Sequence, residues 1–82
     1  MKRVDVALFA AARELAGAET VTIEIPDHAT AATVLQTLAN QHPRLQELLP
    51  ACRLAIDLRF VSPDEPIAGG EQVALIPPVS GG

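Results

Sequence analysis

The sequence predicts an α+β domain in which a mixed sheet of four or five strands carries one main helix on one of its faces. Apolar and polar residues alternate with period two in the first, second and last apolar stretches, which is typical of strands with one buried face. One long segment between them has helical period, so one helix must cover one face of the sheet. The 82 residues suffice for a single domain, 1–82.

The first half of the chain predicts a strand, a short helix and a second strand. Apolar side chains alternate over residues 4–8, and the helix formers of residues 10–16 stop at Gly17, a natural C-cap. Alternation returns over residues 20–25 and ends at Pro26, which cannot donate a hydrogen bond to a neighbouring strand.

The main helix is expected to begin after Thr30, because threonine is a good N-cap residue. The apolar residues that follow share one helical face: Ala31, Val34, Leu35, Leu38 and Ala39. This helix should end before Pro43, since the residue before a proline is disfavoured in the helical region. A further short helical turn is predicted over residues 44–49, closed by Pro50.

The second half predicts the remaining strands. Residues 53–57 form a third strand, and residues 58–61 either continue it or double back. Residues 58–70 are too rich in Pro and Gly to form the second full helix that a ferredoxin-like fold needs. A last strand over residues 71–76 ends at two prolines. A β-grasp (ubiquitin-like) topology satisfies this order of elements.

The interior of the domain shows no catalytic constellation and no metal site. His28 and His42 are far apart, with no paired ligand spacing around Cys52, so both are expected at the surface. Cys52 is more typical of a small buried side chain than of a persulfide carrier, although Arg53 beside it would favour a thiolate. One cysteine cannot form an internal disulfide, which fits a reducing, cytoplasmic setting. We expect no permanently bound cofactor.

The charge and hydropathy of the chain argue against two classes of partner. A formal net charge of −4 offers little to neutralise phosphates, so nucleic acid is not expected as a partner. No apolar run approaches the ~18 residues of a membrane-spanning helix, and the first residues do not read as a signal peptide. A membrane is therefore not expected as a partner either.

The last six residues predict the functional element, a protruding tail over 77–82. Its members are Pro77, Pro78, Val79, Ser80, Gly81 and Gly82. The prolines stiffen the exit from the sheet, the glycines carry no side chain that would obstruct a narrow cleft, and the extended tail would span ~20 Å. The carboxylate of Gly82 is a poor acyl donor until a partner enzyme attaches AMP, which a sulfur nucleophile can then displace.

The last strand predicts which side chains surround the root of this tail. Val73 and Leu75 share one strand face and are expected under the main helix, which leaves Ile76 facing outward. Phe60 is hard to bury in so small a core. It either forms an apolar anchor for a partner together with Ile76, or caps the end of the core.

Four stretches of the chain together resemble the small, sulfur-carrier subunit of molybdopterin synthase, a ubiquitin-like β-grasp family. They are LFAAARELAG (8–17), ATAATVLQTLANQHPRL (29–45), LAIDLRFV (54–61) and DEPIAGGEQVALIPPVSGG (64–82), of which the final PPVSGG is the most specific. The family often has Asn at the position of Asp57, and DGDEV where this chain has GGEQV. These departures lie in a hairpin and a turn, so they concern local contacts and not the tail.

The resemblance implies a mechanism and a set of partners. An E1-like adenylating enzyme would use ATP to form an acyl-adenylate at Gly82, and a persulfide sulfur donor would convert it to a thiocarboxylate. The tail would then enter the large subunit of molybdopterin synthase and give its sulfur to cyclic pyranopterin monophosphate, which builds the dithiolene that holds molybdenum. The large subunit would supply the catalytic side chains, and it would contact the positions of Phe60 and Ile76.

Three other functions remain open from the sequence. A sulfur carrier for thiamine thiazole synthesis has the same fold and a Gly-Gly end, although such carriers are usually shorter and lack the PPVSGG pattern. A ubiquitin-like protein modifier would use the activated carboxylate of Gly82 to form an isopeptide bond with a lysine. In the third case the tail is inert and the chain is a small binding domain.

Overall fold

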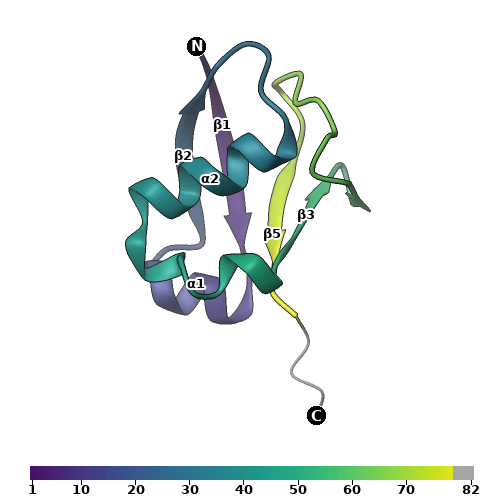
Figure 1. Cartoon of the computed structure of the whole chain (residues 1–82). Helices are drawn as coiled ribbons and strands as arrows, with labels where there is room; N and C mark the ends of the chain where they lie inside the picture. Colours follow the sequence, from purple (N-terminus) through teal and green to yellow (C-terminus); the bar gives the residue numbers. More distant parts are fainter. Residues whose placement is uncertain (79–82) are drawn as a thin grey trace.

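The computed structural model describes residues 1–78, and the predictions for Val79, Ser80, Gly81 and Gly82 lie outside the described residues. The elements are β1 (Lys2–Leu8), α1 (Ala10–Ala16), β2 (Thr20–Ile25), α2 (Ala31–Gln41), the 3-10 turns η1 (Pro43–Leu45) and η2 (Leu49–Ala51), β3 (Arg53–Ile56), β4 (Arg59–Phe60) and β5 (Val73–Ile76). The strands form a mixed sheet in the order β2-β1-β5-β3-β4, in which β1 and β5 are parallel and the other neighbours antiparallel (Figure 1). The predicted α+β class and β-grasp topology are confirmed.

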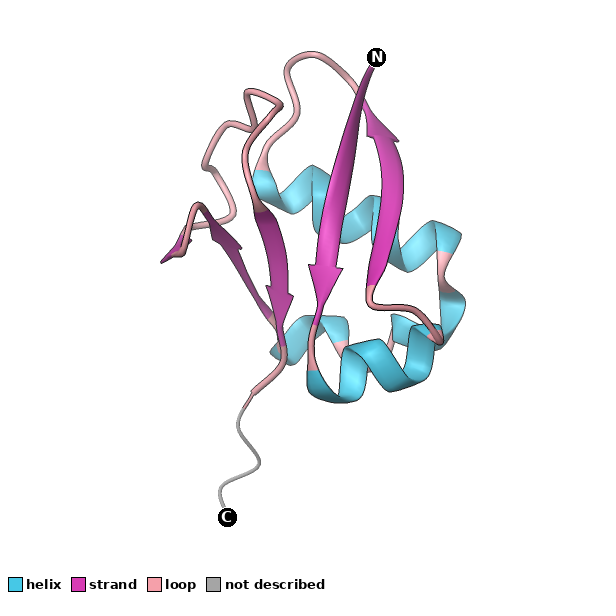
Figure 2. Ribbon diagram, turned by 180° about the vertical axis from the view of Figure 1, so that it is seen from behind, coloured by secondary structure: helices cyan, strands magenta, loops and turns pink. Residues whose placement is uncertain are grey.

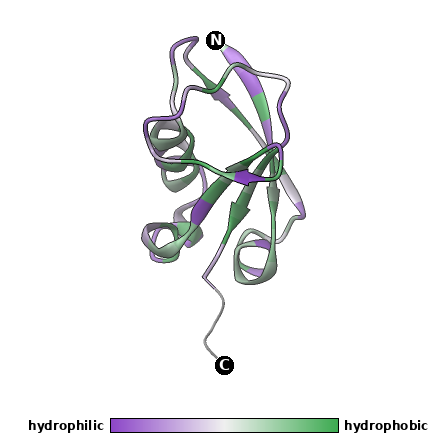
Figure 3. Cartoon of the chain, turned by 90° about the vertical axis from the view of Figure 1, so that its right-hand side faces the viewer, coloured by the Kyte–Doolittle hydropathy of each residue, from purple (hydrophilic) through white to green (hydrophobic). Residues whose placement is uncertain are grey.

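The sheet has one face covered by α2 and one face turned away from it. Figure 1 shows α2 crossing in front of the strands, and in Figure 2, seen from behind, the strands lie in front of α2. The side view in Figure 3 separates these layers and shows the chain leaving at the lower end. In residues 1–78 none of the helices is long and apolar enough to cross a membrane.

The core fills the space between α2 and the covered face. Strand register aligns inward side chains in rows, of which the central one is Val21, Val6, Val73 and Ile56. From α2 the buried residues are Ala31, Val34 and Leu38. All of these are at most 8% exposed, and the described residues include no buried polar or charged side chain. The alternation and the helical period in the sequence therefore found the core correctly.

The helix ends follow the residue types found there. Gly17 is the C-cap of α1 with a φ of 71°, in the left-handed region that glycine tolerates best. Thr30 is the N-cap of α2, where its backbone N–H donates to Oγ1 of Thr33 at 3.2 Å. Both caps were predicted.

Several boundaries differ from the sequence predictions: β1 begins at Lys2 rather than residue 4, and β3 ends at Ile56 rather than Asp57. The expected helical turn over 44–49 is instead two 3-10 turns, and Pro50 lies inside the second rather than closing the first. Proline fits the first positions of a helical turn, where its missing N–H would have no partner in any case. The last strand begins at Val73 rather than Glu71, because the Glu71 carboxylate accepts backbone N–H groups of Ala68 and Gly69 and holds a turn there.

The segment after β3 doubles back, which the sequence had left open. A two-residue turn at Asp57 and Leu58 connects β3 to β4, and Ala55 pairs with Phe60 across the hairpin. Both turn residues have positive φ angles, 50° and 70°. This is the combination that a tight hairpin turn requires to match the twist of its strands.

Truncating the core should destabilise the fold. Leu38 is fully buried, so Leu38→Ala should lower the free energy of unfolding by about 2 to 5 kcal/mol through lost burial and the cavity left behind. Leu15→Ala, at a residue 39% exposed, is the matched control and should cost much less. Urea denaturation measures both, and equal losses would contradict this assignment of the core.

Candidate functional site

The open face of the sheet has a low floor of alanines. Register places Ala7 of β1 beside Ala74 of β5, and Ala74 beside Ala55 of β3. Thr20 continues this row at one end and Phe60 at the other. Because a methyl side chain rises little above the backbone, three adjacent alanines leave a depression between taller neighbours.

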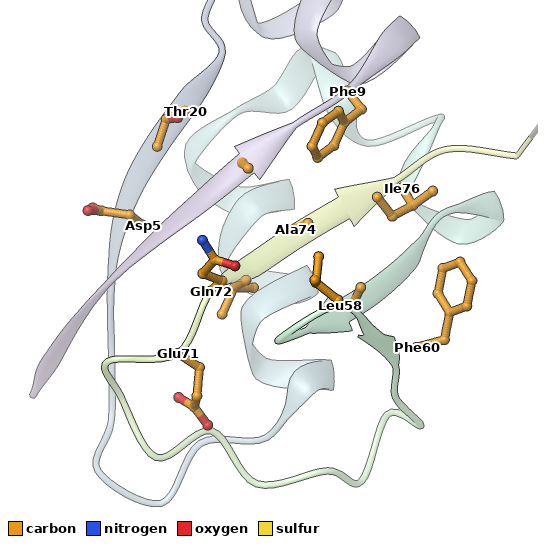
Figure 4. A pocket seen from close by; sticks show the side chains of 12 residues that line it. Asp5, Phe9, Thr20, Leu58, Phe60, Glu71, Gln72, Ala74 and Ile76 are labelled. Atoms are coloured by element: carbon orange, nitrogen blue, oxygen red, sulfur yellow. The ribbon is translucent and has the colours of Figure 1, made fainter.

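Apolar side chains form a wall around part of this floor. They are Phe9, Leu58, Phe60 and Ile76. Figure 4 shows Phe9, Phe60 and Ile76 toward the end where the chain leaves β5, and Leu58 beside Ala74. We call the hollow formed by the alanine floor and this wall the open-face concavity; its volume is about 760 Å³. Phe9, Leu58 and Phe60 are 47%, 92% and 54% exposed. An apolar patch of this kind on a small domain is typical of a protein interaction site.

Two carboxylates, Asp5 and Glu71, lie at the other end of the concavity (Figure 4). Oδ1 of Asp5 accepts a hydrogen bond of 2.6 Å from Oγ1 of Thr22, its cross-strand neighbour. Both carboxylate oxygens of Glu71 accept backbone N–H groups, one at 3.1 Å and one at 2.6 Å. These acids therefore have structural partners and give the hollow a negative rim.

Phe60 does not cap the core. It is the second residue of the edge strand β4, and more than half of it is exposed. The guanidinium carbon of Arg53 lies 4.3 Å from the centroid of its ring, a cation–π contact that holds the ring in place. Exposure thus excludes the core interpretation, while contact with a partner stays a prediction.

The structure places the root of the tail as the strand pattern predicts. Val73 and Leu75 are buried, and Ile76 is half-buried on the open face, where it lines the concavity. Pro77 is buried and Pro78 exposed, so the first residue of the predicted tail packs against the body of the domain. The chain therefore leaves the body directly beside the apolar wall.

Cys52 has the environment of a structural residue. It is half-buried against the core, and its thiol donates to the backbone oxygen of Leu48 at 3.3 Å. Burial raises the pKa of the Cys52 thiol, which keeps it protonated at neutral pH. Arg53, the residue that would favour a thiolate, is engaged with the ring of Phe60 instead.

The histidines do not gather with other ligands. His28 is exposed and His42 is half-buried. Within residues 1–78, no three His, Cys, Asp or Glu side chains come together as they would around a metal ion.

Sequence reasoning missed much of the open-face concavity. Phe9 and Leu58 were not singled out, nor were the three floor alanines. A local signal did exist for the alanines, because each lies at the outward position of its strand. Nothing local indicates that the three outward positions are neighbours, since only strand order and register bring them together.

The comparisons with known proteins cover nearly the whole chain. The model of the ThiS family matches residues 6–82. The molybdopterin synthase sulfur carrier subunit of Chlamydomonas reinhardtii is 35% identical over 82 residues, which span 98% of this chain and 99% of that protein. Small archaeal modifier protein 1 of Haloferax volcanii is 34% identical over 92% of this chain and 95% of its own length.

Solved structures agree with these relationships. The crystal structure of SAMP1 from Haloferax volcanii has a TM-score of 0.85 and 30% identity, and covers 98% of this chain and 99% of that one. Subunits 1 and 2 of molybdopterin-converting factor from Helicobacter pylori were solved as a complex, and one chain matches with a TM-score of 0.69. At 22% identity, over 98% of this chain and 99% of that one, this last likeness shows the fold alone. Taken with the full-length identity to a curated carrier, the family match means that the chain belongs to the ThiS family, as a relative of the molybdopterin synthase sulfur carrier subunits.

Proposed function

We propose that the chain is the sulfur carrier subunit of a molybdopterin synthase and that Gly82 carries the sulfur as a thiocarboxylate. The observation that carries this proposal is the 35% identity to a curated carrier over almost the full length of both chains. The family match extends to residue 82, so it includes the Gly-Gly end. The apolar hollow at the root of the tail supports a role in which a second protein receives that tail.

The chemistry follows from the weakness of a carboxylate as an acyl donor. The Gly82 carboxylate attacks ATP bound to an E1-like enzyme, which forms the acyl-adenylate and releases pyrophosphate. The terminal sulfur of a persulfide then attacks the carbonyl carbon and displaces AMP, and a thiol cleaves the resulting acyl disulfide to leave the thiocarboxylate. The chain itself contributes the glycines, which let its backbone enter a narrow cleft at each step.

The open-face concavity is the proposed docking surface for the large subunit of the synthase. Phe60 and Ile76 form its anchor, because both are apolar, solvent-accessible and next to the point where the tail leaves the body. The solved pair of subunits from Helicobacter pylori supports such an assembly for a protein of this fold. In the complex the large subunit would supply the groups that act on cyclic pyranopterin monophosphate.

Intact mass spectrometry tests the carrier role directly. The chain is incubated with an E1-like enzyme, ATP and a persulfide donor, and its mass is compared with that of a sample lacking ATP. The expected result is an increase that corresponds to exchange of one oxygen for one sulfur, in the ATP sample only. An unchanged mass would contradict the proposal.

A second candidate function is protein modification. It is favoured by the 34% identity to small archaeal modifier protein 1, a relative over 95% of its length. Both functions use the same activation of Gly82 and differ in the final acceptor. An isopeptide bond between Gly82 and a lysine, found by peptide mass spectrometry in cells, would identify the modifier; its absence beside active sulfur transfer would identify the carrier.

Deleting Gly82, or replacing Gly81 with leucine, should abolish sulfur transfer and leave the fold intact. The core that α2 covers lies within residues 4–75, so neither change removes a core contact. Circular dichroism and a reconstituted synthase assay measure the two effects. Loss of folding in the deletion variant would contradict the assignment of a tail.

Cys52→Ala should keep sulfur transfer close to the wild-type rate. Burial raises the pKa of this thiol, so at neutral pH little of it is the thiolate that a sulfur relay would need. The same cause should make wild-type Cys52 react with iodoacetamide more slowly than a free cysteine. A loss of turnover without a loss of thermal stability would show that the thiol takes part.

Phe60→Ala and Ile76→Glu should each weaken binding to the large subunit by ~2 kcal/mol or more, the scale of an interface hot spot. Thermal stability should change little for Phe60→Ala, because the ring is 54% exposed in the free chain. Titration calorimetry and melting curves separate the effects, with Leu15→Ala as the matched control outside the concavity. Unchanged affinity in both variants would show that these side chains lie outside the interface and contradict the anchor.

A further inference from the structure

Leu58 is exposed and strained at once. It is 92% exposed, more than any other large apolar residue in the described part of the chain. Its φ angle is 70°, in the left-handed region where a side chain with a Cβ is disfavoured and glycine or asparagine is usual. Neither burial nor backbone geometry accounts for a leucine here.

Asp57, the other turn residue, has a structural role that explains its residue type. Asp57 also has a positive φ, which aspartate tolerates better than leucine does. Its backbone N–H donates to the oxygen of Gln72 at 2.8 Å, and its Oδ1 accepts the N–H of Gln72 at 2.9 Å. Asp57 thus ties the hairpin to the start of β5, whereas the side chain of Leu58 gains nothing comparable.

The position of Leu58 connects it to the docking surface. Its side chain lies on the wall of the open-face concavity, between Ala74 on the floor and Phe60 at the edge (Figure 4). The wall continues to Ile76, where the tail leaves the body. The tip of the hairpin lies at the start of β5, beside Gln72, so Leu58 is at the end of the wall away from Ile76. A partner that covers the whole concavity, from Ile76 at the tail root past Phe60, also contacts this tip.

We propose that Leu58 is a specificity-determining contact that inserts into an apolar recess of the large subunit. The inference rests on the proposed function and adds a residue to its interface. Burial of the leucine in the complex then explains its exposure in the free chain, and the backbone strain is tolerated because a leucine at this position binds the partner. An exposed leucine on the turn presents an apolar side chain that a partner can bury, whereas the neighbouring aspartate presents a charged one.

A residue that serves binding at the expense of folding can be recognised from two measurements, the affinity for the partner and the stability of the free chain. Removing it should weaken the complex while the free chain becomes no less stable. A core residue would lower both stability and affinity, and a neutral surface residue would change neither. Leu58→Gly relieves the backbone strain, and Leu58→Asn keeps a side chain that tolerates positive φ. Leu58→Met keeps an apolar side chain of similar size.

Titration calorimetry against the large subunit from the same organism, together with melting curves of the free chain, tests the proposal. We expect Leu58→Gly and Leu58→Asn each to weaken binding about tenfold or more, which corresponds to about 1.4 kcal/mol. Leu58→Met should stay within about threefold of wild type, well short of a hot-spot loss. The melting temperatures of the Gly and Asn variants should be equal to or higher than that of wild type. Leu15→Asn, outside the concavity, is the control and should bind as wild type does.

The outcomes separate this inference from the proposed function. If wild type binds the large subunit and the Gly and Asn variants bind as tightly, the role of Leu58 is wrong and the proposed function stands. If wild type does not bind the large subunit, both are wrong. The remaining alternative is that the hairpin binds a second copy of this chain. Sedimentation of the free chain tests it: a wild-type dimer that becomes a monomer in the Leu58→Asn variant would overturn the proposal.

Discussion

The burial of one sheet face under α2 is the constraint on which the rest of this structure depends. Because strand side chains alternate, every residue that packs under α2 forces its neighbour onto the opposite face. Burial of Val6 and Leu8 thereby turns Ala7 outward, and burial of Val73 and Leu75 turns Ala74 outward. The same periodicity that builds the core therefore also builds the floor of the open-face concavity.

The parallel pairing of β1 with β5 at the centre of the sheet positions the site. Leu8 and Leu75 are register partners, so both strands finish at the same end of the sheet. The residues that follow Leu8 and Leu75, which are Phe9 and Ile76, consequently both line the concavity (Figure 4). One strand leads into α1 and the other into the tail. Burial of Pro77 against the body fixes where the chain leaves the sheet, which is beside the wall of the open-face concavity.

The free chain exposes large apolar side chains to water, which is unfavourable, and a local contact reduces the exposed apolar surface. Arg53 lies over the ring of Phe60, where its charge interacts with the ring face. The carboxylates of Asp5 and Glu71 add charged groups to the rim of the hollow. The concavity can thus stay open without a covering helix, and a matching protein surface gains from desolvating it.

The sequence by itself determined the features that depend on apolar periodicity and on helix-capping residues along the chain. Alternation predicted β1, β2 and β5, and helical period predicted α2. Gly17 marked the C-cap of α1, Thr30 marked the N-cap of α2, and the period-two pattern of β5 turned Ile76 outward. Tertiary structure alone decided the strand order, the exposure of Phe60 and the conformation of Leu58. Strand order depends on which distant segments pair, and no local stretch of sequence encodes that choice. The exposure of Phe60 and the conformation of Leu58 depend on the register of the β3–β4 hairpin and on its hydrogen bonds to Gln72 before β5, which the apolar pattern does not specify.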